Sequence, residues 1–217
     1  MTLPNAILFP GALLPLYIFE PRYRRMLSEC LQSHRVFAIA MQKPGCTRAI
    51  PCAVAGMGLV RVAVTRRDGT SYVVLQGLVR VELTTVRRYR PFRLQQFRPL
   101  EDAGVQNSEL PVLTDKLRRL VLERVRTEAR PAEESHPMTV AVEDAVRLNS
   151  LALFSLQHFL HYLAQLQDPG QMADLVSCTM LPGATERQII LETVNLHERL
   201  KRVIDFLSVN TQDNRTK

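Results

Sequence analysis

The chain has 217 residues, 46% of them hydrophobic and none tryptophan, so it can bury an aliphatic core and its composition excludes a disordered protein. Its four cysteines lack the spacing of a disulfide scaffold or a zinc site, and we expect neither disulfides nor a bound metal. Its formal net charge of +7 comes entirely from the stretch between residues 61 and 98, which holds nine arginines and two acidic residues.

The N-terminal segment is apolar, but it has no basic leader and its prolines would break a helix. We therefore expect neither a signal peptide nor a membrane span, and we predict a cytoplasmic protein. Residues 3–19 predict a strand and a proline-rich turn. Pro21 suits a first helical position, so a helix is expected over residues 21–33, followed by a buried strand over residues 36–41.

A period-two pattern between residues 56 and 97 predicts further strands. In the first of these strands, every second residue is a valine: Val60, Val62 and Val64. Asp68 and Gly69 follow, and this dipeptide predicts a two-residue hairpin turn.

Glycines mark two places in these strands. Gly56 and Gly58 lack the third glycine of a dinucleotide-binding fingerprint, and we expect them to mark a β-bulge. The pentapeptide at residues 58–62 recurs at residues 77–81. One recurrence of five residues does not make a repeat protein, but it indicates that two strands have similar packing requirements in a closed sheet.

After residue 99 the composition changes, because residues 101–109 suit a linker and helical periodicity follows. The apolar face expected for the first helix comprises Leu113, Leu117, Leu120 and Val121. Capping boxes are predicted at Asp168, Thr185 and Asn195, since each has Gln or Glu three positions later. We predict an α+β chain with a β-barrel part over residues 1–102 and a helical bundle over residues 103–217.

The sequence contains no recognisable catalytic constellation. It has neither the Gly-Lys of a phosphate-binding loop nor the Gly-x-Ser-x-Gly of a hydrolase nucleophile. His158 and His161 are three residues apart, but no third metal ligand lies on their predicted helix. We therefore expect no catalytic residue, no cofactor and no metal, and a protein that acts by binding.

Two interpretations fit the arginine-rich stretch. The arginines can contact the phosphates of a nucleic acid, or they can keep an outward strand face soluble while their stems cover apolar wall. No aromatic-rich strand of the RNA-stacking type accompanies them. The residues predicted for an RNA-binding surface are Arg61, Arg80, Arg87, Arg88, Arg90 and Arg93.

Several N-terminal motifs follow one another in a tight order: Leu3-Pro4, Leu8-Phe9-Pro10-Gly11, Leu14-Pro15-Leu16 and Ile18-Phe19-Glu20-Pro21-Arg22-Tyr23. With these motifs the chain resembles the N-terminal substrate-recognition domain of the ATP-dependent Lon protease, particularly its bacterial stand-alone relatives. The repeated strand pentapeptide, Leu181-Pro182 and Glu198-Arg199-Leu200 look like later parts of the same family. The resemblance covers nearly the whole chain.

The resemblance implies a PUA-like pseudo β-barrel with an inserted helix, followed by an α-helical bundle. In the full protease this domain helps to recognise substrates, while other domains unfold and cleave them. This chain ends at Lys217 without an ATPase or peptidase module, so only recognition is expected to carry over. We expect a non-enzymatic module that binds an unfolded polypeptide or a partner protein, and no membrane. RNA binding by a PUA-like surface is the alternative.

Apolar residues around the glycine-proline turn are predicted to line a polypeptide-binding groove: Leu13, Leu14, Leu16 and Phe19. Arg22 and Tyr23 are expected to be exposed beside this groove. The alternative is that the apolar side chains fill the interior of the barrel, because most apolar residues near strands are core residues.

Overall fold

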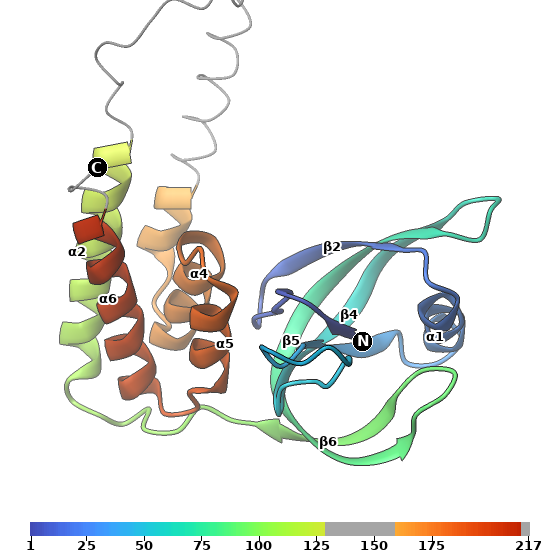
Figure 1. Cartoon of the computed structure of the whole chain (residues 1–217). Helices are drawn as coiled ribbons and strands as arrows, with labels where there is room; N and C mark the ends of the chain where they lie inside the picture. Colours follow the sequence, from blue (N-terminus) through green and yellow to red (C-terminus); the bar gives the residue numbers. More distant parts are fainter. Residues whose placement is uncertain (129–158, 214–217) are drawn as a thin grey trace, which may run out of the picture.

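The computed structural model describes residues 1–128 and 159–213, in which a curved β-sheet lies beside a group of helices (Figure 1). The strands are β1 (Thr2–Leu3), β2 (Leu13–Ile18), β3 (Val36–Met41), β4 (Val54–Thr65), β5 (Ser71–Arg88) and β6 (Leu94–Leu100). The helices are α1 (Pro21–Leu31), α2 (Leu110–Glu128), α4 (Pro169–Met180), α5 (Ala184–Glu192) and α6 (Leu196–Asp213). The helix predicted after Pro21 and the buried strand that follows it are confirmed.

The sheet has six strands in the order β1-β3-β4-β5-β2, and β6 also pairs with β5. β1 runs parallel to β3, and the other pairs are antiparallel. The strand β5 is long enough for β2 to pair with its first half and β6 with its second half. Among the described strands, β1 has only two residues and pairs only with β3. The predicted α+β class is therefore confirmed, but the expected closed sheet is wrong.

Two glycines allow the N-terminal segment to cross the sheet at close range. A Cβ atom on Gly56 would lie 1.9 Å from the carbonyl oxygen of Leu8, and one on Gly77 would lie 1.9 Å from that of Phe9. Gly58 pairs with Gly77 across β4 and β5. In β5 the repeated pentapeptide therefore begins where the crossing backbone requires glycine; in β4 it begins at Gly58, where a Cβ atom would lie 2.7 Å from a terminal methyl group of Leu8.

Two register shifts interrupt the pairing of β4 with β5. The first lies between Met57 and Gly58, where a bulge is predicted, but its extra residue is Leu78 of β5. A second shift lies between Val60 and Val62. One extra residue reverses the alternation of faces, so Val60 is buried whereas Val62 is exposed. The predicted alternation of Val60, Val62 and Val64 is therefore broken after Val60.

The turn between β4 and β5 also differs from the prediction. The amide of Arg66 donates to the carbonyl of Thr70 at 2.8 Å, and the amide of Gly69 donates to the carbonyl of Arg66 at 2.9 Å. Gly69 has a φ of 79°, a left-handed conformation that glycine adopts without steric cost. The connection is therefore longer than the predicted two-residue turn.

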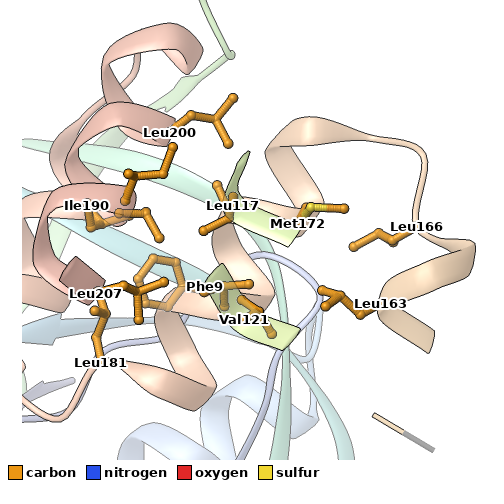
Figure 2. Close-up of a cluster of buried hydrophobic side chains, with 14 of the residues drawn as sticks. Phe9, Leu117, Val121, Leu163, Leu166, Met172, Leu181, Ile190, Leu200 and Leu207 are labelled. Carbon is orange, nitrogen blue, oxygen red and sulfur yellow. The ribbon is translucent and has the colours of Figure 1, made fainter. Parts of the chain in front are cut away.

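The helices share their core with the N-terminal segment of the chain. Figure 2 shows Phe9 among the buried side chains of the helical part. Leu117 and Val121 of α2 are fully buried in this cluster, as predicted. Its other members include Leu163, Met172, Ile190, Leu200 and Leu207. The sheet and the helical part are therefore joined by a common apolar core.

The ends of the helices test the predicted caps. Asp168 caps α4, since its carboxylate accepts hydrogen bonds from two backbone amides at 2.7 and 3.1 Å. Asn195 accepts from the amide of Glu198 at 3.2 Å, so this cap is also confirmed. Thr185 is not a cap, because α5 already begins at Ala184. No helix within residues 1–128 and 159–213 is both long enough and apolar enough to cross a membrane.

Candidate functional site

Exposed apolar side chains from neighbouring strands form a patch on the outer face of the sheet. Tyr17 of β2 lies opposite Tyr72 of β5, which in turn lies opposite Val64 of β4. Because side chains alternate between the two faces of a strand, exposed residues two or four positions from these lie on the same face. We call this set the outer-face patch, and it comprises Leu13, Tyr17, Phe19, Val62, Val64 and Tyr72.

The aromatic rings of the outer-face patch contact one another. The ring centroids of Tyr17 and Tyr72 are 5.0 Å apart, and those of Tyr17 and Phe19 are 5.9 Å apart. The exposed fractions are 59% for Phe19 and 54% for Tyr72. Contiguous exposed apolar surface is typical of an interaction site, whereas single exposed apolar residues are normal anywhere on a protein.

The structure divides the residues predicted for a polypeptide-binding groove into two sets. Leu13, which is 64% exposed, and Phe19 lie on the outer-face patch. Leu14 and Leu16 are half-buried and pack against the core cluster beneath the sheet. Leu13 and Phe19 are therefore exposed, as a polypeptide-binding groove requires. Leu14 and Leu16 instead contribute to the interior, which is the alternative stated above.

Sequence reasoning misses two aromatic members of the patch. Tyr17 follows the same alternation along β2 as Leu13, and that spacing is a signal that could have found it. Tyr72 joins the patch only through the register of β5 against β2 and β4. No local pattern around Tyr72 indicates this position.

Tyr23 was expected to be exposed, but only 5% of its surface is accessible. It shares the inward face of α1 with Met26, and its hydroxyl donates to the carbonyl of Thr2 at 3.0 Å. Burial raises the pKa of the Tyr23 hydroxyl. Arg22 is exposed, as expected. Its guanidinium lies 4.5 Å from the centroid of the Tyr23 ring and 2.8 Å from the carboxylate of Glu20.

A pocket of about 620 Å³ lies among α1, β3 and β6, and we call it the α1–β6 pocket. Its apolar lining includes Met26, Phe37, Met57, Leu83 and Phe97. Three arginines also line it, namely Arg22, Arg88 and Arg93. The guanidinium of each lies over an aromatic ring of the same lining.

The arginines predicted for an RNA-binding surface do not form one surface. Arg80 is only 4% exposed and is paired with Asp174, so its placement on an RNA-binding surface is wrong. Arg61 is next to the residue of β4 that pairs with Leu75 of β5. Arg87 lies on β5 as well, about 40 Å farther along that strand than Leu75. The remaining members lie together at the end of β5 and in the segment after it: Arg87, Arg88, Arg90 and Arg93.

Arg80 belongs to a buried cluster of charges between the sheet and the helices. Its guanidinium donates to the carboxylate of Asp174 and, at 3.1 Å, to the carbonyl of Leu191. Arg199 is fully buried, donates to Asp102 at 3.0 Å and lies 3.7 Å from Asp174. Burial raises the pKa of Asp174, and the two guanidinium groups act in the opposite direction. The cluster joins β5 to α4 and α6.

The histidine pair considered for metal binding is only partly described. His161 shares a hydrogen bond of 2.9 Å with Gln165, and His158 lies outside the described residues. In the described part of the chain, no three His, Cys, Asp or Glu side chains gather as metal ligands would. The outer-face patch and the α1–β6 pocket offer apolar contact and guanidinium groups, which is the chemistry of binding.

An open, curved sheet that carries a helix and continues into a helical part defines an α+β fold. The N-terminal domain of a Lon protease from the Mycobacterium avium complex has this fold, with a TM-score of 0.69, 17% sequence identity and 96% of both chains covered. A Lon N-terminal domain protein from Xanthomonas campestris matches with a TM-score of 0.61 and 16% identity, over 94% of this chain and 95% of the other.

The sequence comparison shows the family. The family model of the ATP-dependent protease La (LON) substrate-binding domain matches residues 1–209, and the chain belongs to this family. The Lon protease of Desulfosudis oleivorans is 22% identical over 208 residues, which cover 94% of this chain and 22% of that protein. Lon protease 2 of Myxococcus xanthus is 23% identical over 215 residues, with 96% and 23% covered. The chain therefore spans less than a quarter of these relatives.

Proposed function

We propose that this chain is a non-enzymatic module that binds polypeptide, with the outer-face patch contacting apolar side chains of an unfolded segment. The observation that carries the proposal is the contiguous exposed face of aromatic and aliphatic residues from three strands. Membership of a family of substrate-binding domains supports binding as the role. Recognition alone is assigned to this chain.

Side-chain contacts, rather than added strand pairing, carry the binding in this proposal. β2 is the last strand in the order of the sheet, and an extended segment can add to such an edge. However, Pro15 lies in the middle of β2 and has no N–H, which limits the hydrogen-bond ladder that the strand can form. Leu13 and Tyr17, on either side of Pro15, remain exposed for contact with apolar side chains.

Single-stranded RNA is the second candidate ligand, because one observation favours it. The guanidinium of Arg66 lies 6.0 Å from the ring centroid of Tyr72, and a cation beside exposed rings suits stacked bases. The aliphatic members of the patch, Val62 and Val64, favour polypeptide instead. Apolar side chains of a polypeptide would bury this aliphatic surface, which contributes about 25 cal/mol per Å². Base stacking requires aromatic rings and does not require aliphatic side chains. We therefore favour polypeptide.

Binding of a permanently unfolded protein tests the proposal. The affinity for reduced, carboxymethylated α-lactalbumin, measured by fluorescence anisotropy, is expected to fall at least about tenfold in a Tyr17→Ser/Phe19→Ser/Tyr72→Ser variant. The control is Val105→Ser/Val112→Ser, which changes exposed apolar residues outside the patch and should leave the affinity unchanged. Equal affinity of the patch variant and the parent would refute the proposal, as would tight RNA binding that displaces the unfolded protein.

A further inference from the structure

We infer that the α1–β6 pocket takes an apolar side chain of a polypeptide whose flanking residues are acidic. The inference rests on the proposed function, since it gives the same module a second contact with polypeptide and determines which segments it prefers. The lining of the pocket contains no residue of the outer-face patch. The two surfaces can therefore be changed separately.

The interior of the pocket suits an apolar group. Met26 and Met57 line it, and methionine side chains adjust to ligands of varied shape. Phe37 and Leu83 extend the apolar wall. The volume of about 620 Å³ lies within the usual range of ligand sites and leaves room for a large aliphatic or aromatic side chain.

The guanidinium groups of the pocket are held over aromatic rings. Arg88 lies 4.7 Å from the centroid of Phe92, and Arg93 lies 5.3 Å from that of Tyr89. Arg22 lies over Tyr23 in the same way. Stacking restrains the plane of a guanidinium and leaves the N–H groups at its edge free to bind a carboxylate. The pocket is therefore prepared to receive carboxylates beside the apolar group.

The charge of the lining also favours an acidic ligand, because Glu29 is the one carboxylate among three arginines. Glu29 lies 3.5 Å from Arg88, and Glu20 outside the lining pairs with Arg22. Both pairs are solvent-exposed and therefore weak. A ligand carboxylate can therefore take the place of the glutamate in either pair. Among the described residues, Arg93 pairs with no carboxylate and donates to the carbonyl of Ala49 at 3.4 Å.

The positions of the arginines favour an internal acidic segment over a chain terminus. Arg22 lies on α1, Arg88 ends β5, and Arg93 directly precedes β6. A free C-terminus supplies one carboxylate, whereas Asp or Glu residues on both sides of an apolar residue supply carboxylates in two directions. The occupant assigned to the pocket is therefore an apolar residue between acidic residues.

A labelled peptide tests this assignment. The probe is a fluorescein-labelled peptide with one Phe between two Asp-Glu pairs and an amidated C-terminus, and anisotropy gives its affinity at physiological salt. Arg88→Ala and Arg93→Ala are each expected to weaken binding at least about tenfold. Arg87→Ala is the matched control, since Arg87 is exposed and does not line the pocket. Peptides with Lys in place of the acidic residues, or Ser in place of Phe, are expected to bind at least about tenfold more weakly.

A second variant tests the interior without changing charge. Ala49 is a half-buried loop residue of the lining, and Ala49→Leu should occupy part of the pocket and weaken binding of the peptide. Unchanged affinity in both arginine variants, equal binding of the Lys peptide, or displacement of the probe by single-stranded RNA would overturn the inference.

The outer-face patch variant separates this inference from the proposed function. If that variant loses the unfolded protein but still binds the acidic peptide, both stand. A second outcome is that neither the parent nor the patch variant binds unfolded α-lactalbumin, while binding of the peptide still requires Arg88 and Arg93. The proposed role of the patch then fails and the pocket assignment survives. If the patch variant loses the peptide and the arginine variants do not, the peptide binds the patch, and only the pocket assignment is overturned.

Discussion

The guanidinium of Arg80 and the carboxylate of Asp174 form an ion pair that is buried between β5 and α4. Replacement of Arg80 by Ala is expected to lower the free energy of unfolding by about 3–5 kcal/mol, because a buried carboxylate loses its nearest partner. Urea denaturation followed by circular dichroism measures this change. Arg61→Ala removes an exposed arginine and should change the same quantity by less than about 0.5 kcal/mol. A loss below about 1 kcal/mol for Arg80→Ala would show that the pair does not hold the sheet to the helices.

The close approach at Gly77 leads to a second stability prediction. Gly77→Ala is expected to destabilise the fold by about 3 kcal/mol or more, because the new methyl group would overlap the carbonyl of Phe9. Gly11→Ala is the comparison, since Gly11 has a positive φ but open space around it. It should cost only about 1–2 kcal/mol, from backbone strain alone. Thermal unfolding of both variants gives the order of the two effects, and the reverse order would contradict the crossing geometry.

The cysteines lead to a prediction about pH. Burial raises the pKa of Cys30, Cys52 and Cys178, and the thiolate is the reactive form. These thiols should react slowly with a disulfide reagent at neutral pH, and their rates should rise only as the pH approaches the raised pKa values. The folded state holds these protons to higher pH than the unfolded state, so the associated stability is lost as the pH rises through the raised values.

Cys46 provides the control for the thiol experiment. It is half-exposed and should react first, so Cys46→Ser should remove the fast phase. In concentrated urea all four thiols should react at similar rates. Four equal rates in the native protein would contradict the burial of Cys30 and Cys52.

The cluster of arginines at the end of β5 leads to a prediction about RNA. Binding of single-stranded RNA should be measurable only at low salt and should disappear at physiological salt, because a few phosphate contacts give weak binding that is driven by counterion release, which salt opposes. Replacement of Arg87, Arg88 and Arg90 by Ala should abolish the low-salt binding. Filter binding over a series of salt concentrations tests both points. Tight binding at physiological salt that depends on the RNA sequence would contradict this expectation.

Features that depend on neighbours in the sequence could be predicted. The uninterrupted apolar run of β3 and the proline at the start of α1 identify these elements correctly. The caps at Asp168 and Asn195 are also local, because the amides that they bind lie two or three residues away. In each case the residue type and its immediate context determine the structure.

Features that depend on distant partners could not be predicted. Arg80 occupies the same strand pattern as the exposed arginines, and only its contact with Asp174, 94 residues away in sequence, distinguishes it. The contact between Tyr17 and Tyr72 depends on strand register, which local residue patterns do not determine. The α1–β6 pocket is likewise absent from the sequence signals, because Arg88 and Met26 meet there only through the fold.

The position of Phe9 in the helical core affects how the chain matures on the ribosome. Phe9 shares that core with residues as far along the chain as Leu207. At about 5–20 residues per second, roughly 10–40 s separate the synthesis of these two residues. Throughout that interval the aromatic ring near the start of the nascent chain lacks its final neighbours. Phe9 can therefore complete its packing only after α6 has been synthesised, whereas the core cluster beneath β2 and β3 needs no residue beyond Phe92.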